Sequence, residues 1–297
     1  MLTQRQCLPC FVEDISQAVE LLCEDLPAQR ELLGLCLRRL SETLDFSQPP
    51  SYHITDLHRL VKAFLDLEVP FCERRKRLNE IGMEIADQIR CEGRELFGLS
   101  RFRHFAVWAL AGNTLDSRSA GTGYAFCPEA TREHLSSYVK KGLAVDQLGL
   151  LLERVQGAKR ILYLHDNVGE LPLDAAFIEE IKKFSGPVIS ALRGGAITSD
   201  ATYEDGLAIG LHRISDRMIL AGPDTLGISW REMSAELAEE LRQASLVLAK
   251  GQANYYVLSE YRNQIRGEVF LLFSTKCDPV AGHFGLRGKH LVATFLS

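Results

Sequence analysis

The chain has 297 residues, of which 46% are hydrophobic and 25% are charged, and its formal net charge is −5 at pH 7. These values exclude a disordered chain, and the negative charge argues against a protein that binds nucleic acid by neutralising phosphates. No apolar run reaches the length of a membrane span, the start lacks a secretory pattern, and the eight cysteines are scattered. We therefore expect a cytoplasmic protein with reduced thiols, long enough to bury a large core.

The first part of the chain, from Cys7 to about Asp116, has helical periodicity throughout. Apolar side chains recur every three or four residues, as in the stripe of Phe11, Ile15 and Val19. Prolines at positions 49, 50 and 70 separate the helical segments, and the segment from residue 102 is expected to form the last buried helix, ending at Gly112-Asn113. These patterns predict an all-helical domain over residues 1–145.

Short apolar runs alternate with helical segments from residue 146 to residue 297. The predicted strands are 160–165, 187–192, 216–222, 245–251 and 268–274, and the helices after them include 173–184, 203–211, 229–244 and 255–264. Such alternation indicates a parallel sheet covered by helices on both faces. The sequence thus predicts an α/β fold, with a doubly wound domain over residues 146–297 carried on the helical domain.

Each predicted strand ends in polar or cationic residues that stand beside small ones. Ligands of open parallel sheets bind in the crevice outside the carboxyl ends of the strands. The residues after the five strands are, in order, Asp166, Asn167 and Glu170; Arg193 and Asp200; Asp224 and Thr225; Lys250 and Asn254; and Lys276. Because five such ends converge at one edge of the sheet, we expect a functional site there.

The residue types at this edge favour phosphate chemistry with a hard metal ion. Asp166, Asn167 and Asp200 offer the oxygen ligands that Mg²⁺ or Mn²⁺ prefers. Arg193, Lys250 and Lys276 are cations that can hold a phosphoryl group. The sequence contains no P-loop, no dinucleotide fingerprint after the first strand and no histidine pair at zinc spacing.

Taken in this order, the motifs resemble the metal-dependent damage-control phosphatases, long catalogued as a domain of unknown function. The similar segments are Asp166-Asn167-x-Gly169-Glu170 with Asp174, Arg193-Gly194 with Ser199-Asp200-Ala-Thr202, Lys250-Gly251-Gln252-Ala-Asn254, and FLLFSTKCDPVA in the last strand. Cys7-x-x-Cys10 and segment 111–116 are similar to the microbial branch of the family. The resemblance covers nearly the whole chain. It implies a Rossmann-like three-layer α/β/α domain beside a helical domain, and phosphatase activity on sugar phosphates and related damaged or surplus metabolites.

The resemblance also implies a role for individual residues. Asp166, Asn167 and Asp200 would bind a divalent cation, which is Mg²⁺, Mn²⁺, Co²⁺ or Ni²⁺. Lys250 would complete the catalytic set by binding the phosphoryl group, and the substrate-binding residues would be Arg193, Asn254, Asn113, Asp116 and Glu170. The partner would be a small phosphate ester, with neither nucleic acid nor a membrane involved. Departures from the family pattern at Ser199, Ala196 and Tyr256 leave the metal ligands intact and bear on substrate preference.

Simpler explanations exist for several of these residues. Asp166 and Asn167 can form a strand-ending turn, and Asp200 can cap a helix. Lys250 can be a solvated lysine, and Arg193 can pair with Asp166 or Glu170. Asn113 and Asp116 can cap the end of a helix. We expect packing to explain His165, and the start of a helix to explain Cys7 and Cys10, with zinc or redox chemistry as the alternative.

Rival functions also remain open at this point. They are a non-catalytic sensor of sugar phosphates or nucleotides, and a transferase on the same site. Within the hydrolase hypothesis, Asp166 or Asp200 either activates a water molecule, or Asp166 attacks phosphorus directly.

Overall fold

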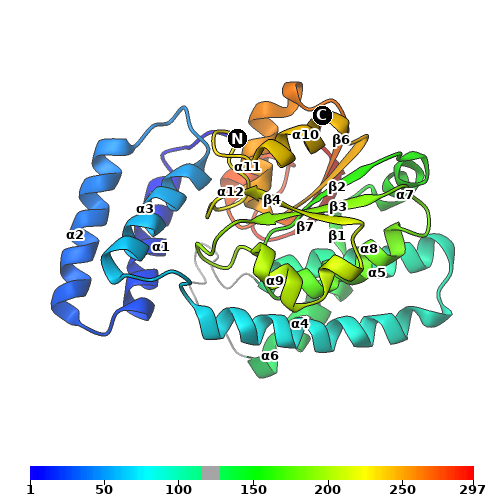
Figure 1. Cartoon of the computed structure of the whole chain (residues 1–297), viewed down its shortest axis with the longest axis horizontal. Coiled ribbons are helices and arrows are strands. Elements are labelled where there is room, and N and C mark those ends of the chain that lie inside the picture. Colours follow the sequence, from blue (N-terminus) through cyan, green and yellow to red (C-terminus); the bar gives the residue numbers. More distant parts are fainter. Residues whose placement is uncertain (116–127) are drawn as a thin grey trace.

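Three helices at the N-terminus form a bundle that lies beside the rest of the molecule (Figure 1). In the computed structural model, which describes residues 1–115 and 128–297, they are α1 (Cys7–Leu22), α2 (Leu26–Thr43) and α3 (Pro50–Leu65). Proline lies at the first positions of α2 and α3, where its missing N–H costs nothing. The apolar faces of the three helices meet in a core of their own that includes Phe11, Leu32 and Leu57.

A seven-stranded sheet forms the centre of the remaining chain. Its strands are β1 (Leu143–Asp146), β2 (Ile161–Leu164), β3 (Val188–Arg193), β4 (Arg217–Gly222), β5 (Leu246–Lys250), β6 (Glu268–Ser274) and β7 (Leu291–Phe295). The order across the sheet is β1-β7-β6-β5-β2-β3-β4, and all neighbours are parallel except β6 and β7. Every residue of β2, β3 and β5 is buried, as the continuous apolar runs predicted.

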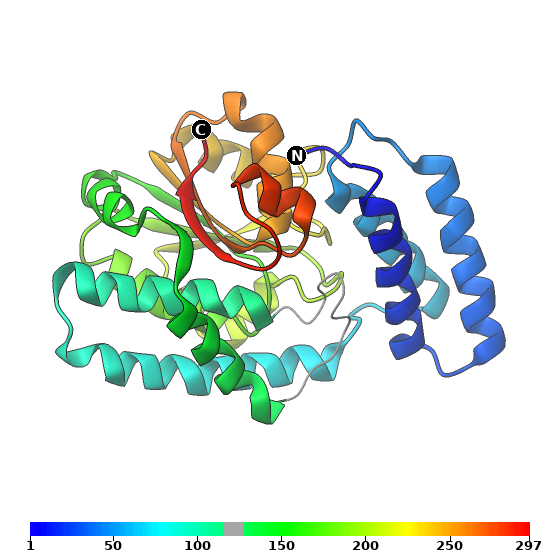
Figure 2. The ribbon, with the colours of Figure 1, turned by 180° about the vertical axis from the view of Figure 1, so that it is seen from behind.

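Helices cover both faces of this sheet (Figures 1 and 2). One layer holds α4 (Cys72–Glu92), α5 (Gly98–Gly112), α7 (Leu148–Gly157), α8 (Leu171–Ile181) and α9 (Tyr203–Ala208), with α6 (Pro128–Lys141) packed on α5 and α4. The other layer holds α10 (Ala235–Gln243), α11 (Gln252–Tyr261) and α12 (Asp278–His283). Each layer encloses its own hydrophobic cluster against the sheet. The predicted α/β fold with a mainly parallel sheet and a preceding helical region is confirmed.

Some elements differ from the sequence-based expectation. β1 and β7 were not predicted; they pair with each other, and β7 also pairs with β6, at one end of the sheet. The helix expected over 229–244 begins only at Ala235, since Ser234 caps it by accepting a hydrogen bond from the Leu237 amide. Short 3₁₀ turns lie at Gly93–Glu95, Asn113–Leu115, Leu211–Arg213 and Arg262–Gln264.

Two findings bear on the limits of the helical region. Helices α4 and α5 pack against α8, within the layers of the α/β part, and the proposed division between residues 145 and 146 falls inside β1.

Within the described residues, no helix combines the length and apolar character that crossing a membrane requires.

Candidate active site

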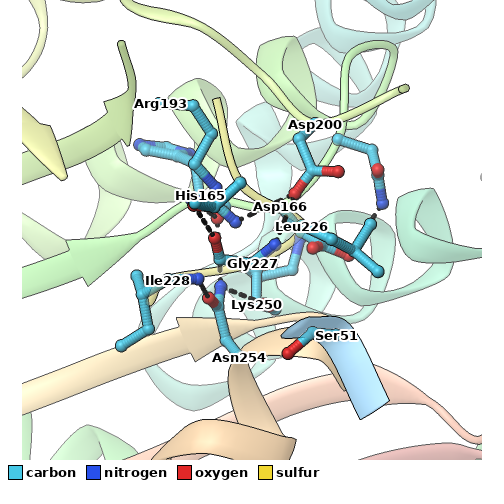
Figure 3. A network of polar contacts seen from close by, with 12 residues as sticks. Ser51, His165, Asp166, Arg193, Asp200, Leu226, Gly227, Ile228, Lys250 and Asn254 are labelled. Atoms are coloured by element: carbon cyan, nitrogen blue, oxygen red, sulfur yellow. Dashed lines mark hydrogen bonds and ion pairs between the residues drawn. The ribbon is translucent and has the colours of Figure 1, made fainter. Parts of the chain in front are cut away.

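The chain reverses its direction across the sheet between β2 and β5. From β2 the strands continue to β3 and β4 on one side, whereas β5 and β6 lie on the other side of β2. Loops that leave two neighbouring strands at such a point turn apart and open a crevice at the carboxyl ends of the strands. Asp166 follows β2 and Lys250 ends β5, so both lie at this point (Figure 3).

Asp166 belongs to a buried cluster of hydrogen-bonded side chains. Its Oδ2 accepts hydrogen bonds from the side-chain amides of Asn113 at 2.9 Å and Asn167 at 2.7 Å. Glu170 Oε1 accepts from the backbone N–H of Asn167 and from Asn113 Nδ2, both at 3.0 Å. Asn113 Oδ1 in turn accepts from the backbone N–H of Ser274, at the end of β6. Four of the predicted site residues thus come together, and they do more than form a turn.

Asp200 is held close to this cluster by the loop that follows β3. Asn167 and Asp200 pair as an isolated antiparallel bridge, which joins the two acid-bearing loops. Asp200 Oδ1 accepts hydrogen bonds from the Gly227 N–H at 2.7 Å and from Arg193 Nη2 at 3.2 Å (Figure 3). The carboxylate is therefore fixed by a buried cation and by a backbone amide from the loop after β4.

Asp200 does not cap a helix. The N-cap of α9 is Thr202, whose Oγ1 accepts a hydrogen bond from the Asp205 N–H at 3.2 Å. The Asp205 side chain accepts from the Thr202 N–H at 2.9 Å, which completes a reciprocal capping box. The alternative explanation of Asp200 as a helix cap is wrong.

Burial, with negative charge close by, perturbs the pKa of the Asp166 carboxyl group. Burial, together with the carboxylates of Glu170 and Asp200, raises the pKa of Asp166 to about 8, although Lys276 and Arg193 act in the opposite direction. A cation close to Asp166 would favour its ionised form and relieve the repulsion.

The donor set at this point fits a hard cation. In residues 1–115 and 128–297, no three His, Cys, Asp or Glu side chains are arranged to hold a metal ion. The oxygen donors that meet here are the two carboxylates of Asp166 and Asp200 and the side-chain amide of Asn167, whose loops are joined by the Asn167–Asp200 bridge. Carboxylate and amide oxygens suit Mg²⁺ and Mn²⁺ better than they suit zinc, which prefers nitrogen and sulfur.

The ammonium group of Lys250 points into the protein interior. It donates to the Ala109 carbonyl at 2.9 Å, to Glu170 Oε2 at 2.6 Å and to Asp174 Oδ1, and its side chain is fully buried. Burial opposes its charge, yet Asp174 and Glu170 raise the pKa of Lys250 to about 12. The explanation as a solvated lysine is wrong, whereas its contact with a phosphoryl group stays a prediction. Asp174 also binds the ring of His165, which lies inside the core as packing requires.

Arg193 and Asn254 both hold the backbone carbonyl of His165. Arg193 Nη1 donates to this oxygen at 3.0 Å and Asn254 Nδ2 at 3.1 Å (Figure 3). Asn254 Oδ1 accepts from the Ile228 N–H at 2.8 Å, which ties the loop after β4 to α11. Arg193 forms its ion pair with Asp200, and not with either acid of the first loop. Its buried Nε finds no acceptor among the described residues, so this guanidinium keeps one donor unused.

Two side chains from α4 position the acid-bearing loops, and neither was predicted from the sequence. Arg75 Nη1 donates to the Thr198 carbonyl, and Nη2 donates to the Asp200 carbonyl at 2.8 Å. Asn79 Oδ1 accepts from the Gly169 N–H at 2.9 Å. A signal was present, because both residues fall on the buried stripe of α4. A charged residue in line with apolar ones indicates a buried partner.

Comparison with known proteins identifies the family of the chain. A family model described as the damage-control phosphatase ARMT1-like domain matches residues 3–291. The chain belongs to this family. A damage-control phosphatase of Pyrococcus horikoshii is 30% identical over 282 residues, which cover 95% of this chain and 93% of the relative. A damage-control phosphatase of Archaeoglobus fulgidus is 29% identical over 290 residues, covering 97% and 96% of the two chains.

The fold is also found in a solved structure. The crystal structure of a DUF89 family protein from Pyrococcus horikoshii superposes with a TM-score of 0.87, at 29% sequence identity and over the whole of both chains. Membership of the damage-control phosphatase family supports a phosphatase role.

The remaining residues of the motif resemblance are Asn113, Asp116, Cys7 and Cys10. Asp116 lies outside the described residues. Asn113 directly follows α5, so it stands at the end of a helix and also binds Asp166. Cys7 is the first residue of α1 and is half-buried, as a helix start requires. A zinc or redox role for Cys7 and Cys10 stays the alternative to packing at the helix start.

Proposed function

We propose that this protein is a metal-dependent phosphomonoester hydrolase that acts on small phosphorylated metabolites such as sugar phosphates. One observation carries the proposal: the loops after β2 and β3 hold two buried carboxylates, Asp166 and Asp200, together with the Asn167 amide at the switch point of the sheet. A simple anion sensor gains nothing from acids beside its ligand, because they repel it. The family match supports phosphatase chemistry, and the motif resemblance supports the substrate class.

In the proposed site, Asp166, Asn167 and Asp200 hold one divalent cation, which is Mg²⁺, Mn²⁺, Co²⁺ or Ni²⁺. When bound, this cation polarises a phosphate oxygen and activates a water molecule. The protein's own contribution is to fix the ligands in advance. Asp200 is held by Arg193 and by the Gly227 N–H, so little reorganisation is needed when a ligand arrives.

Lys276 and Arg193 supply the positive charge for the phosphoryl group in this proposal. The charges of both side chains lower the pKa of Asp166 against the effect of burial, so both cations lie near the acids of the proposed site. Lys276 follows β6, and its backbone N–H donates to Gln252 Oε1 at 2.8 Å, which fixes the start of its side chain. Charged hydrogen bonds to phosphate oxygens offset the negative charge that hydrolysis moves onto the leaving oxygen.

Removal of divalent cations is expected to abolish the activity. Phosphate release from a panel of sugar phosphates should fall to background in the presence of a chelator, and should return with Mg²⁺, Mn²⁺, Co²⁺ or Ni²⁺. The physical reason is that the acids of this site repel an anionic ester unless a cation offsets their charge. Thermal unfolding gives an independent readout, because a cation at about a hundred times its Kd adds about 2.7 kcal/mol of stability. Full phosphate release in metal-free buffer contradicts the proposal.

Asp200→Asn is expected to weaken cation binding by about tenfold to a hundredfold, since a charged ligand is worth about 1.5–3 kcal/mol and the amide keeps the same shape. Phosphate release should fall at least as much. Glu204→Gln is a matched control, because it removes one acid nearby in the chain from an exposed position on α9. Cation affinity is measured by titration. An unchanged affinity in Asp200→Asn would remove Asp200 from the metal site.

A further inference from the structure

A group of fully buried charges lies directly behind the candidate active site. Lys250 at the end of β5 forms ion pairs with Glu170, which immediately precedes α8, and with Asp174 in the first turn of α8. The Ala109 carbonyl of α5 is the third acceptor of the ammonium group. The exposed fraction of each of the three charged side chains is 0%, so no water competes for these contacts.

The contacts of Lys250 leave nothing for a substrate. A lysine ammonium has three N–H donors, and the three acceptors use all of them. A phosphoryl group could gain a hydrogen bond from Lys250 only by breaking an ion pair in a dry environment, where an uncompensated carboxylate is costly. The geometry therefore argues against a direct role in phosphate binding.

Glu170 connects Lys250 to the proposed metal ligands. One of its carboxylate oxygens, Oε2, accepts from Lys250 at 2.6 Å. The other, Oε1, accepts from the Asn167 N–H at 3.0 Å, from Asn167 Nδ2 at 3.2 Å and from Asn113 Nδ2 at 3.0 Å. The same two amides also donate to Asp166 Oδ2. The position of Lys250 thus determines the orientation of Glu170. Glu170 in turn orients the side-chain amides of Asn113 and Asn167, which donate to Asp166.

We propose that Lys250 is a positioning residue, which clamps Glu170 and thereby holds Asn167 and Asp166 in the arrangement that binds a cation. The inference rests on the proposed function, because it takes these two residues as metal ligands. It differs from a phosphate-binding role in one measurable way. Loss of a positioning residue weakens the cation site, whereas loss of a phosphate-binding residue weakens the affinity for phosphate at a saturated cation site.

The test compares Lys250→Met with Lys276→Met in two measurements. The first is Mn²⁺ affinity, measured from the spectroscopic signal of free Mn²⁺ and independent of turnover. The second is inhibition by inorganic phosphate at saturating Mn²⁺. We expect Lys250→Met to weaken Mn²⁺ binding by about tenfold or more and to change phosphate inhibition by less than about threefold. Lys276→Met should do the reverse. Weaker phosphate inhibition with unchanged Mn²⁺ affinity in Lys250→Met overturns the inference.

A second variant separates positioning from simple loss of the fold. Lys250→Met leaves two buried acids without a cation, whereas Lys250→Met with Asp174→Asn keeps the net charge of the group unchanged. The double variant leaves one buried acid unpaired instead of two, so it is expected to lose less stability than Lys250→Met and still to bind Mn²⁺ about tenfold more weakly, because Glu170 has lost its clamp. Asp174→Asn alone keeps the Lys250–Glu170 ion pair, so its Mn²⁺ affinity should stay within about threefold of wild type.

Each outcome has a defined consequence. A folded double variant that binds Mn²⁺ as wild type does overturns the inference. Should the double variant not fold, Glu170→Gln breaks the same ion pair with an isosteric side chain and must weaken Mn²⁺ binding in the same way. A wild-type protein that binds Mn²⁺ but hydrolyses no phosphate ester contradicts the proposed function and leaves the positioning test intact. A wild-type protein that binds no divalent cation contradicts both.

Discussion

Gly251→Ala is expected to eliminate phosphate release and to lower the stability of the protein by several kcal/mol. Gly251 follows Lys250 and has φ +80° and ψ 157°, a backbone conformation that is almost confined to glycine. A Cβ atom at this position would lie 1.8 Å from Asp166 Oδ2 and 2.1 Å from its Cγ. Because Asp166 is buried among its hydrogen-bond partners, it has no free space into which to move.

Two costs add in this variant. Holding alanine in that conformation costs about 1–3 kcal/mol, and overpacking of a dense interior costs about another 1–3 kcal/mol. Any relief requires displacement of the Asp166 carboxylate, which is the proposed metal ligand. Cation affinity, phosphate release and thermal unfolding are the measurements.

A matched control for this glycine lies in α7. Gly149 has no positive φ, and a Cβ added there would have no atom within 4 Å, so Gly149→Ala should leave stability unchanged or raise it by up to about 1 kcal/mol. Wild-type cation affinity and turnover in Gly251→Ala would show that the loop after β5 does not approach Asp166 in this way.

Arg75→Met is expected to destabilise the protein by about 3–5 kcal/mol, as removal of one partner from a buried ion pair does. The guanidinium of Arg75 is buried, pairs with Asp205 and binds the carbonyls of Thr198 and Asp200. Without it, these oxygens lose their donors in a place that water reaches poorly. The loop that carries Asp200 would no longer be held against α4, so cation affinity should fall together with stability.

The control for this prediction lies half a turn further along the same helix. Arg77 is exposed and forms a single ion pair with Glu80, so Arg77→Met should change the free energy of unfolding by no more than about 0.5 kcal/mol. Denaturant unfolding of both variants, with cation titration, checks the pair. Equal stability of Arg75→Met and Arg77→Met would mean that Arg75 is not part of the support of the site.

The place of the site could be predicted from local patterns. The strands Ile161–Leu164 and Leu246–Lys250 consist of apolar runs that indicate buried strands, with Lys250 at the end of the second, and the polar residues stand where these runs end. Parallel strands bring their carboxyl ends to one edge, so the proximity of Asp166, Asn167 and Asp200 follows from chain order alone. The α/β fold class was predictable for the same reason, because periodicities of 2 and 3.6 residues are local properties.

The roles of individual side chains could not be predicted in this way. Lys250 ends a strand, and whether its ammonium meets a ligand or the interior depends on acceptors supplied by α5 and α8, which lie far from it in the sequence. Arg75 lies on the buried stripe of α4, which indicates a buried partner, but only the tertiary structure shows that this partner is the loop after β3.

The sequence by itself determined the type of fold, the edge of the sheet at which the acids gather and the family motifs that they form. Only the tertiary structure decided which donor meets which acceptor: that Arg193 pairs with Asp200, that Glu170 lies between Lys250 and the amide of Asn167, and that the short strands β1 and β7 join the sheet. The physical reason is distance along the chain. Periodicity and capping arise from neighbours within a few residues, whereas a buried charge takes its partner from whichever element packs against it, and nothing near it in the sequence specifies that element.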